Sequence, residues 1–282
     1  MMRQRPSVRL IREKSKKLKI PYQNLLAAGA REWVLTCLFQ EPTDVKILIK
    51  RTSQLGLRSY RTGAFKDLYL CVLNTEVTGE WLTGFLSDHL QETDFRVKER
   101  TDGYDVHLEV EFDRIRIPVV LHIQIQEEKK APTVSFPLKL ISENDKTLTL
   151  PCYYPELELA ELFADYFSRL ELYPDMAALE TVYLYATGRN LNGKYVSLYL
   201  EEEFEKRNLA LTEETRKQYE QSLYNKALQA RFKGYLGSSK RKEPGFDDVH
   251  KILAALFDPV LEALLKEQIF FGDWICDVQR YL

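Results

Sequence analysis

Cysteine, histidine and long apolar runs are all scarce in this sequence of 282 residues. The four cysteines, Cys37, Cys71, Cys152 and Cys276, are far apart and lie in apolar or aromatic neighbourhoods. This placement favours reduced, packed thiols and excludes a disulfide scaffold. No cysteine pair has the spacing of metal ligands, and none of the four histidines lies near a cysteine, so a zinc site is not expected. No run reaches the roughly 18 apolar residues that a membrane-spanning helix needs.

Several enzyme motifs are also missing. The sequence contains no Walker loop, GxSxG elbow, HExxH or GxGxxG, so the corresponding enzyme classes have no motif support. The first twenty residues are basic but lack the apolar segment of a signal peptide. A net charge of −2 means that no global basic field draws the whole surface to nucleic acid. We therefore expect a soluble, cytoplasmic protein without a membrane partner.

The first half of the chain has the pattern of a mixed sheet with leading helices. The hydrophobic content of 45% is sufficient for a real core. Apolar residues recur at helical spacing over residues 22–39 and 77–90. Residues 104–112 and 115–126 alternate strictly, and the DRIR segment between them predicts a tight turn and a hairpin. Further strands are expected at residues 45–50, 67–73, 95–100 and 147–154.

The second half is predicted to be helical. Pro155 and two acids in the first turn favour a helix start, and the last segment is expected to be a final helix or a pair of helices broken near Pro259. Helices are expected at residues 155–170, 175–188, 194–207, 211–236 and 247–268. The predicted fold class is therefore α+β. A domain of residues 1–150 carries a mixed sheet flanked by helices, and a domain of residues 151–282 is a C-terminal helical bundle.

The N-terminal segment is strongly basic. Residues 1–20 hold eight lysines and arginines against one acid, Glu13. One interpretation is a helix with a solvated basic face. The other is a phosphate-contacting arm for RNA or DNA, with Arg12, Lys16 and Lys17 as its binding residues.

The order of segments resembles that of a known family. The matching segments are SVRLIREKSKKLKIPYQNLLAAGAREWVLTCLF, ILIKRTSQL, KDLYLCVL, RIPVVLHIQIQ, PELELAELFADYFSRL, MAALETVYLYA and FDDVHKILAALFDPVLEALL. In this order they resemble the AbiEii/AbiGii-type nucleotidyltransferases, the toxin halves of abortive-infection toxin–antitoxin pairs. The resemblance implies a nucleotidyltransferase-like fold across nearly the whole chain.

The chemistry of such a fold demands particular residues. Two Mg²⁺ ions hold a nucleoside triphosphate and the attacking oxygen in line, and carboxylates hold the metals. The family carries an Asp-x-Asp strand because alternate residues of a strand point to one face. Glycines after the first strand let the backbone approach the phosphates, and a further carboxylate comes from a later strand.

This sequence departs from those requirements on the strands. The resemblance places Lys50 at the end of the first strand, but Arg51 and Thr52 stand where the glycine pair belongs. Asp67 matches the first carboxylate, but Tyr69 stands at the second and cannot ligate Mg²⁺ as a phenol at neutral pH. The later carboxylate is His122, and imidazole is a poor Mg²⁺ ligand.

The helices depart from the family pattern as well. Glu161 of the Ala-Glu-Lys motif remains, but Leu162 replaces the lysine. The Lys-Asp and Asp positions of the next helix are Ala177, Ala178 and Thr181. The sequence thus keeps the apolar framework and loses the chemistry. Lys50, Asp67 and Glu161 are its vestigial catalytic residues, and Arg51, Tyr69 and His122 are candidate binding residues.

Three functions stay open at this point. The first is a catalytically degenerate nucleotidyltransferase-like protein, a binding or structural subunit in phage defence or a toxin–antitoxin system, with a protein partner and no metal or cofactor. The second is a divergent active toxin that uses Mg²⁺ and NTP to add nucleotides to tRNA or another acceptor, through Asp67 with Glu161 or Asp113. The third is a nucleic-acid-binding module that uses the basic N-terminal segment and the Lys50–Arg51 edge.

Overall fold

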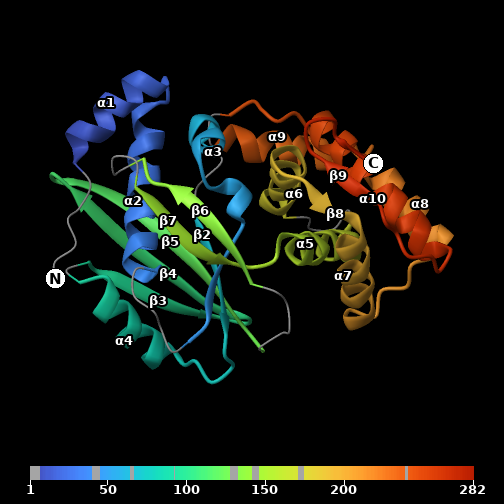
Figure 1. The fold of residues 1–282 in the computed structure, drawn as a ribbon, viewed down its shortest axis with the longest axis horizontal. Helices are drawn as coiled ribbons and strands as arrows, with labels where there is room; N and C mark the ends of the chain where they lie inside the picture. The colour runs from blue at the N-terminus through green and yellow to red at the C-terminus, as the bar shows by residue number, and fades with distance from the viewer. Residues whose placement is uncertain are drawn as a thin grey trace. The chain divides into compact units, whose positions relative to one another are not determined.

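The computed structural model describes residues 7–39, 45–63, 67–91, 93–127, 133–141, 146–170, 175–238 and 241–282. The chain divides into two compact units, Met1–Tyr153 and Tyr154–Leu282. The fold is mixed α/β (Figure 1), and its larger sheet lies in the first unit. None of the described helices is both long and apolar enough to cross a bilayer.

The described residues of the first unit form a seven-stranded mixed sheet in the order β3-β4-β5-β2-β1-β7-β6. Strand β2 is parallel to β5, and β1 is parallel to β7, whereas the other neighbouring pairs are antiparallel. The strands are β1 (Ile47–Lys50), β2 (Leu68–Leu73), β3 (Phe95–Arg100), β4 (Gly103–Phe112), β5 (Ile115–Gln126), β6 (Val134–Lys139) and β7 (Thr147–Cys152).

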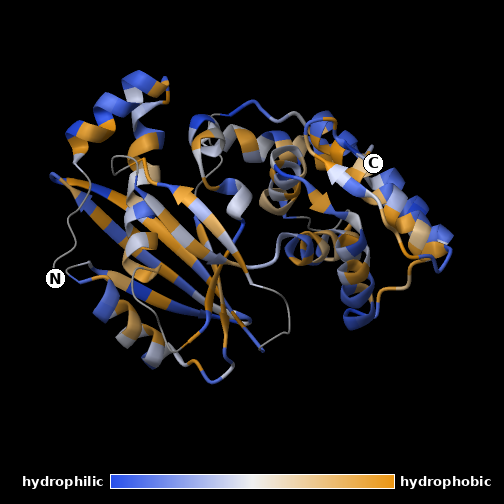
Figure 2. Ribbon diagram, in the orientation of Figure 1, coloured by the Kyte–Doolittle hydropathy of each residue, from blue (hydrophilic) through white to orange (hydrophobic). Residues whose placement is uncertain are grey.

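Helices cover one face of this sheet. Helix α2 packs on β5, and α4 packs on β3. The residues of β4 and β5 alternate between this apolar interface and the opposite, more polar face (Figure 2), as half-buried strands do. The helices of this unit are α1 (Val8–Leu18), α2 (Tyr22–Phe39), the 3-10 turn η1 (Thr52–Gln54), α3 (Leu57–Thr62) and α4 (Gly79–His89).

The predicted hairpin is confirmed by the pairing of β4 with β5. Its two-residue turn holds Asp113 and Arg114 at φ 45° and 71°, both in the left-handed region that such turns require. At the other end of β4, a Cβ on Gly103 would lie 2.0 Å from the Ile123 carbonyl oxygen, so only glycine permits this close approach. These two ends fix the register of the whole hairpin.

The second unit combines helices with a small sheet. Helix α10 contacts α6, α7, α8 and α9, and Phe163 of α5 stacks on Phe257 of α10 with ring centroids 3.7 Å apart. A short sheet in the order β10-β9-β8 borders the helices. The elements are α5 (Pro155–Arg169), α6 (Met176–Gly188), β8 (Leu191–Asn192), α7 (Gly193–Lys206), α8 (Glu213–Ser222), α9 (Lys226–Ser238), α10 (Phe246–Leu265), β9 (Asp273–Ile275) and β10 (Arg280–Tyr281).

Three features differ from the sequence predictions. Strands β6, β8, β9 and β10 were not expected, because short runs near prolines and glycines carry little periodicity. Residues 211–236 form two helices, α8 and α9, instead of one. Helix α10 continues through Pro259, since its buried neighbours Phe257, Val260 and Leu261 hold it in place by packing.

A buried ion pair lies inside the second unit. Glu180 of α6 is fully buried, and both carboxylate oxygens accept hydrogen bonds from the guanidinium of Arg241. The Tyr235 hydroxyl donates a further hydrogen bond of 2.7 Å to Glu180 Oε2. A carboxylate at this depth is tolerable only because these donors neutralise and solvate it.

We expect Arg241→Met to lower the free energy of unfolding by about 3–5 kcal/mol, because it leaves Glu180 buried without a counter-charge. The double variant Glu180→Leu/Arg241→Met should regain most of that loss, since two apolar side chains need no pairing. Urea unfolding at pH 7 measures both. The exposed pair Glu262–Lys266 provides the control, because Lys266→Met should cost less than about 1 kcal/mol. A double variant as unstable as the single one would contradict the expectation.

Candidate functional site

A row of polar side chains crosses the sheet on the face opposite α2. The register sets Lys50 of β1 against Tyr69 of β2, and Tyr69 against His122 of β5. His122 in turn faces Asp105 of β4. Four neighbouring strands therefore contribute one residue each to a continuous line.

His122 lies between two carboxylates. Its Nδ1 is 2.7 Å from Oδ1 of Asp105, and its Nε2 is 3.6 Å from Oδ2 of Asp67. The three side chains keep only 20–32% of their surface exposed. Both ring nitrogens are thus directed at carboxylate oxygens, an arrangement that suits a protonated imidazole, which donates at both nitrogens.

The titration of these groups follows from the geometry. Burial would lower the pKa of His122, but the hydrogen bonds and charges of Asp67 and Asp105 outweigh it and raise that pKa above its ordinary value. Burial acts to raise the pKa of Asp105, but His122 and Arg100 lower it overall. Both shifts favour the charged forms, so the imidazolium and the carboxylate stabilise each other.

Two arginines add positive charge around the carboxylates. Arg100 of β3 donates to Oδ1 of Asp105 over 3.0 Å and also pairs with Asp102. Arg31 of α2 is buried, and burial lowers its pKa to about 10, although the negative charge of Asp67 opposes that shift. Asp105 is therefore hydrogen-bonded to both His122 and Arg100, whereas Asp67 lies beside His122 and acts on Arg31 through its charge.

An aromatic stack completes the row. The Tyr69 ring lies 4.7 Å from the His122 ring and nearly parallel to it. The guanidinium carbon of Arg51 lies 3.7 Å from the centroid of the Tyr69 ring, within cation–π distance. Arg51 has φ 54°, a left-handed conformation at the start of η1. Tyr69 is therefore sandwiched between a cation and an imidazole.

Lys50 is held at the end of β1 by polar and aromatic contacts. Its Nζ donates to Oε1 of Gln124 over 3.1 Å and lies 4.4 Å from the centroid of the Tyr153 ring. The Tyr153 hydroxyl donates to Oε1 of Gln126 over 3.2 Å. These contacts fix the position of the ammonium group next to β2 and β5.

The row offers poor ligands for a metal ion. Among the described residues no group of three His, Cys, Asp or Glu side chains could hold one. Asp67 and Asp105 approach opposite nitrogens of one ring, so the ring separates them and they do not converge on a common point. The arrangement can hold a proton on His122, but its two carboxylates do not converge on one metal ion.

The structure brings together five of the predicted site residues on the sheet of the first unit. Lys50, Arg51, Asp67, Tyr69 and His122 share the polar row. Glu161 lies on α5 in the second unit, and Arg12, Lys16 and Lys17 lie on α1.

Asp113, the proposed partner of Asp67 in the active alternative, does not join the row. It lies in the β4–β5 turn, beyond the pair Phe112↔Ile115. That pair is seven residue pairs from Asp105↔His122, roughly 23 Å along the strands. Asp113 and Asp67 therefore cannot share a metal ion.

Sequence reasoning missed Asp105, Arg100 and Arg31. Asp105 could have been found from the predicted hairpin. A two-residue turn at Asp113 and Arg114 sets residue 105 directly opposite residue 122. A second hairpin likewise sets Arg100 opposite Gly103, beside Asp105. Nothing in the sequence pattern indicates Arg31, since its position depends on how α2 packs against the sheet.

We expect His122 to titrate at a higher pH than His250 in an NMR titration of the four imidazoles. His122 is paired with carboxylates, whereas burial lowers the pKa of His250. Asp105→Asn should move the His122 midpoint to lower pH and leave His250 unchanged. The charge pair should therefore stabilise the fold below the ordinary pKa of histidine and lose that contribution as the pH rises through the raised pKa. A His122 midpoint at or below that of His250 would exclude the charged cluster.

Comparison with known proteins adds no relative: no protein-family model matches the chain, and no curated protein matches it significantly.

Proposed function

We propose that this chain is a catalytically degenerate nucleotidyltransferase-like protein that acts as a binding or structural subunit. The observation that carries the proposal is the place of His122, whose imidazole lies between Asp67 and Asp105. An imidazole thereby occupies the surroundings in which a metal-dependent transferase needs carboxylates that converge on Mg²⁺.

The strand arrangement supports this proposal. The β2 residues that resemble the Asp-x-Asp motif are Asp67 and Tyr69, and β5, which resembles the later carboxylate strand, pairs directly with β2. The register sets Tyr69 against His122, so the two substituted positions are neighbours. The three positions proposed for metal ligation therefore come together on one face, but only Asp67 is an acid.

Electrostatics also argues against Mg²⁺ at this point. A divalent cation placed beside Asp67 would lie a few ångströms from His122, whose pKa the neighbouring carboxylates raise, and the imidazolium form would repel it. Mg²⁺ also demands hard oxygen ligands in octahedral geometry, which a phenol and an imidazole do not supply.

The remaining groups fit a binding role. Tyr69 presents a ring that is held in place by the guanidinium of Arg51 and the imidazole of His122. We propose that this face contributes to a surface that binds a partner, and that helix α10 corresponds to the closing helix of the resembled family. A role in phage defence or a toxin–antitoxin system, with a protein partner, follows from the resemblance.

We expect no nucleotide transfer by the chain. Incubation with Mg²⁺ and each of the four NTPs, labelled at the α-phosphate, should leave a tRNA pool and candidate protein acceptors unlabelled, because Asp67 is the single acid among the three positions proposed for metal ligation. Gel autoradiography measures incorporation, and Asp67→Asn sets the background. Incorporation that disappears in Asp67→Asn would establish the active alternative and overturn the proposal.

We expect Tyr69→Asp/His122→Asp to create a metal site, because it sets two further carboxylates beside Asp67. In titrations with Mn²⁺ followed by electron paramagnetic resonance, the natural chain should show no saturable site below about 1 mM, and the double variant should bind at least tenfold more tightly.

The matched control makes the same two changes elsewhere. Tyr224 and His250 form a ring pair in the second unit with centroids 4.8 Å apart, and Tyr224 is 71% exposed. Tyr224→Asp/His250→Asp changes the net charge equally and should bind no more Mn²⁺ than the natural chain. Equal binding by the two double variants would show that the row is not a dismantled metal site.

A further inference from the structure

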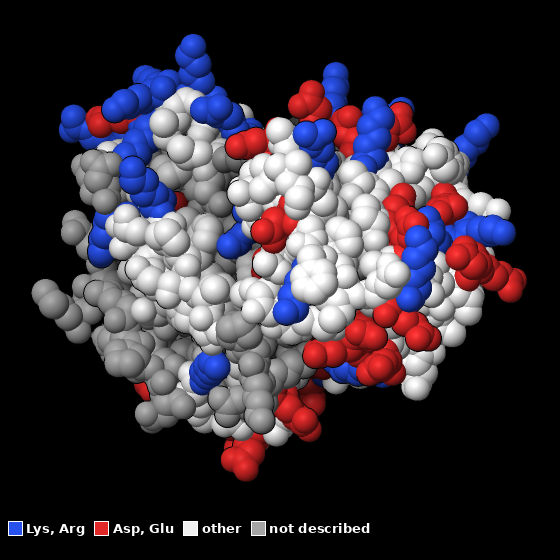
Figure 3. All heavy atoms as spheres, turned by 45° about the vertical axis from the view of Figure 1, so that its right-hand side comes forward, with Lys and Arg blue, Asp and Glu red and all other residues white. Residues whose placement is uncertain are grey.

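The outer face of α1 gathers positive charge. Val8 and Ile11 are buried and anchor the helix on α2. The opposite face is exposed and carries Arg9, Arg12, Lys16 and Lys17, followed by Lys19 at the helix end. Lys and Arg side chains concentrate in this upper left region of Figure 3, with few acids among them. The rest of the chain must be net negative, because the total charge is −2.

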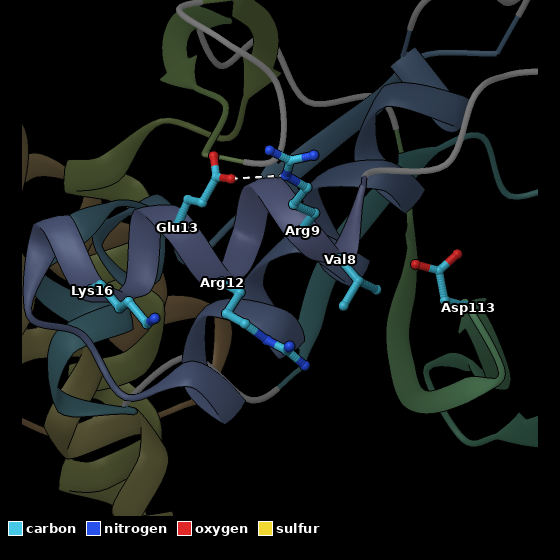
Figure 4. Close-up of a pocket in the computed structure, with 6 residues that line it drawn as sticks. All are labelled: Val8, Arg9, Arg12, Glu13, Lys16 and Asp113. Carbon is cyan, nitrogen blue, oxygen red and sulfur yellow. Dashed lines mark hydrogen bonds and ion pairs between the residues drawn. The ribbon is translucent and has the colours of Figure 1, made fainter.

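A pocket of about 420 Å³ adjoins this face, between α1 and the β4–β5 turn. Figure 4 shows Arg9 and Glu13 paired along one side of the helix, while Arg12 and Lys16 extend from its other side, and Asp113 lies across from Val8. The pocket is lined by Val8, Arg9, Arg12, Glu13, Lys16 and Asp113. It is therefore mostly charged, with one apolar wall.

Three of these cations have no acidic partner. Arg9 pairs with Glu13 over 3.0 Å, but Arg12, Lys16 and Lys17 contact no carboxylate in the part of the chain that the structure describes. The Arg12 guanidinium instead lies 5.6 Å from the centroid of the Tyr22 ring, which limits its freedom without neutralising it. These side chains present charge that only an external anion would neutralise.

We propose that the basic face of α1 binds the phosphodiester backbone of a nucleic acid. Arg12 and Lys16 are four residues apart, about 6 Å along the helix axis, so each can neutralise a different phosphate of one strand. An arginine beside a pocket can also donate two parallel hydrogen bonds to one phosphate. Contacts of this kind hold the backbone and carry no base sequence.

Other anionic partners fit this face less well. A helix that lies on a membrane needs a broad free apolar face, but Val8 and Ile11 of α1 are buried and Leu10 and Leu18 are half-buried. A protein partner would need a buried apolar centre in the interface, and Val8 is the single apolar residue of the pocket lining. A chain with net negative charge repels a polyanion elsewhere, which directs it to α1.

This proposal is independent of the polar row on the sheet. The pocket residue Asp113 lies roughly 23 Å along the strands from His122, so the two surfaces are distinct. If α1 does not bind RNA, the proposal of a degenerate transferase is unaffected. If the chain transfers nucleotides, the proposal that α1 binds nucleic acid is unaffected.

The test measures fluorescence anisotropy of the full chain with a labelled 20-nucleotide single-stranded RNA and, separately, duplex RNA and duplex DNA. Binding should weaken steeply between 50 and 200 mM KCl, by about 20-fold for three phosphate contacts on a single strand. Arg12→Gln/Lys16→Gln/Lys17→Gln should weaken binding at 50 mM KCl by at least about tenfold and flatten the salt dependence. The three nucleic acids show which backbone geometry fits best.

The control removes the same residue types from another exposed helix. Lys226, Arg231 and Lys233 of α9 are exposed, and their combined change to glutamine alters net charge equally. That variant should bind within about twofold of the natural chain, because the contacts are local. The proposal would be overturned if the two triple variants lost the same amount of affinity. It would also be overturned if binding did not depend on salt, or if no nucleic acid bound at 50 mM KCl. Competition by polyglutamate or anionic vesicles at equal charge concentration would also overturn it.

Discussion

The arrangement of the polar face of the sheet depends on the positive charges that neutralise two half-buried carboxylates, Asp67 and Asp105. Asp67 and Asp105 are too enclosed for water alone to stabilise them, so each requires a nearby cation. In a metal-dependent transferase that cation is Mg²⁺. Here the protein supplies His122, Arg100 and Arg31 instead, and the Arg51–Tyr69 stack packs against the imidazole. The function proposed for the chain follows from this substitution of side chains for metal.

This neutralisation depends on strand register. A shift of one residue in β5 would move His122 to the apolar face and leave both carboxylates unpaired. The left-handed turn at Asp113 and the close approach at Gly103 prevent that shift on one side of β5. The parallel pairing with β2 fixes the other side, because six residues of each strand pair in sequence. The backbone thus determines which charges meet.

The local part of this arrangement is contained in the sequence, and the non-local part is not. Alternation over residues 104–126 predicts the hairpin, and its two-residue turn determines that residue 105 faces residue 122. The parallel pairing of β2 with β5 joins segments some fifty residues apart, so no local pattern encodes its register. That Tyr69 meets His122 was accessible only through the resemblance to a family. The interaction of Arg31 with the charge of Asp67 could not be predicted. It depends on the packing of helix α2, which is buried on nearly all sides.

The surrounding charges also oppose the creation of a metal site by single substitutions. If His122 alone became an acid, it would lie directly opposite Asp105 on the adjacent strand and close to Asp67, where like charges destabilise a sheet. If Tyr69 alone became an acid, it would remove the ring that separates Arg51 from His122, and the new carboxylate would pair with the guanidinium before any metal. Each single substitution therefore costs stability or fails to free a ligand. The interactions among these side chains thus hold the row in its present arrangement.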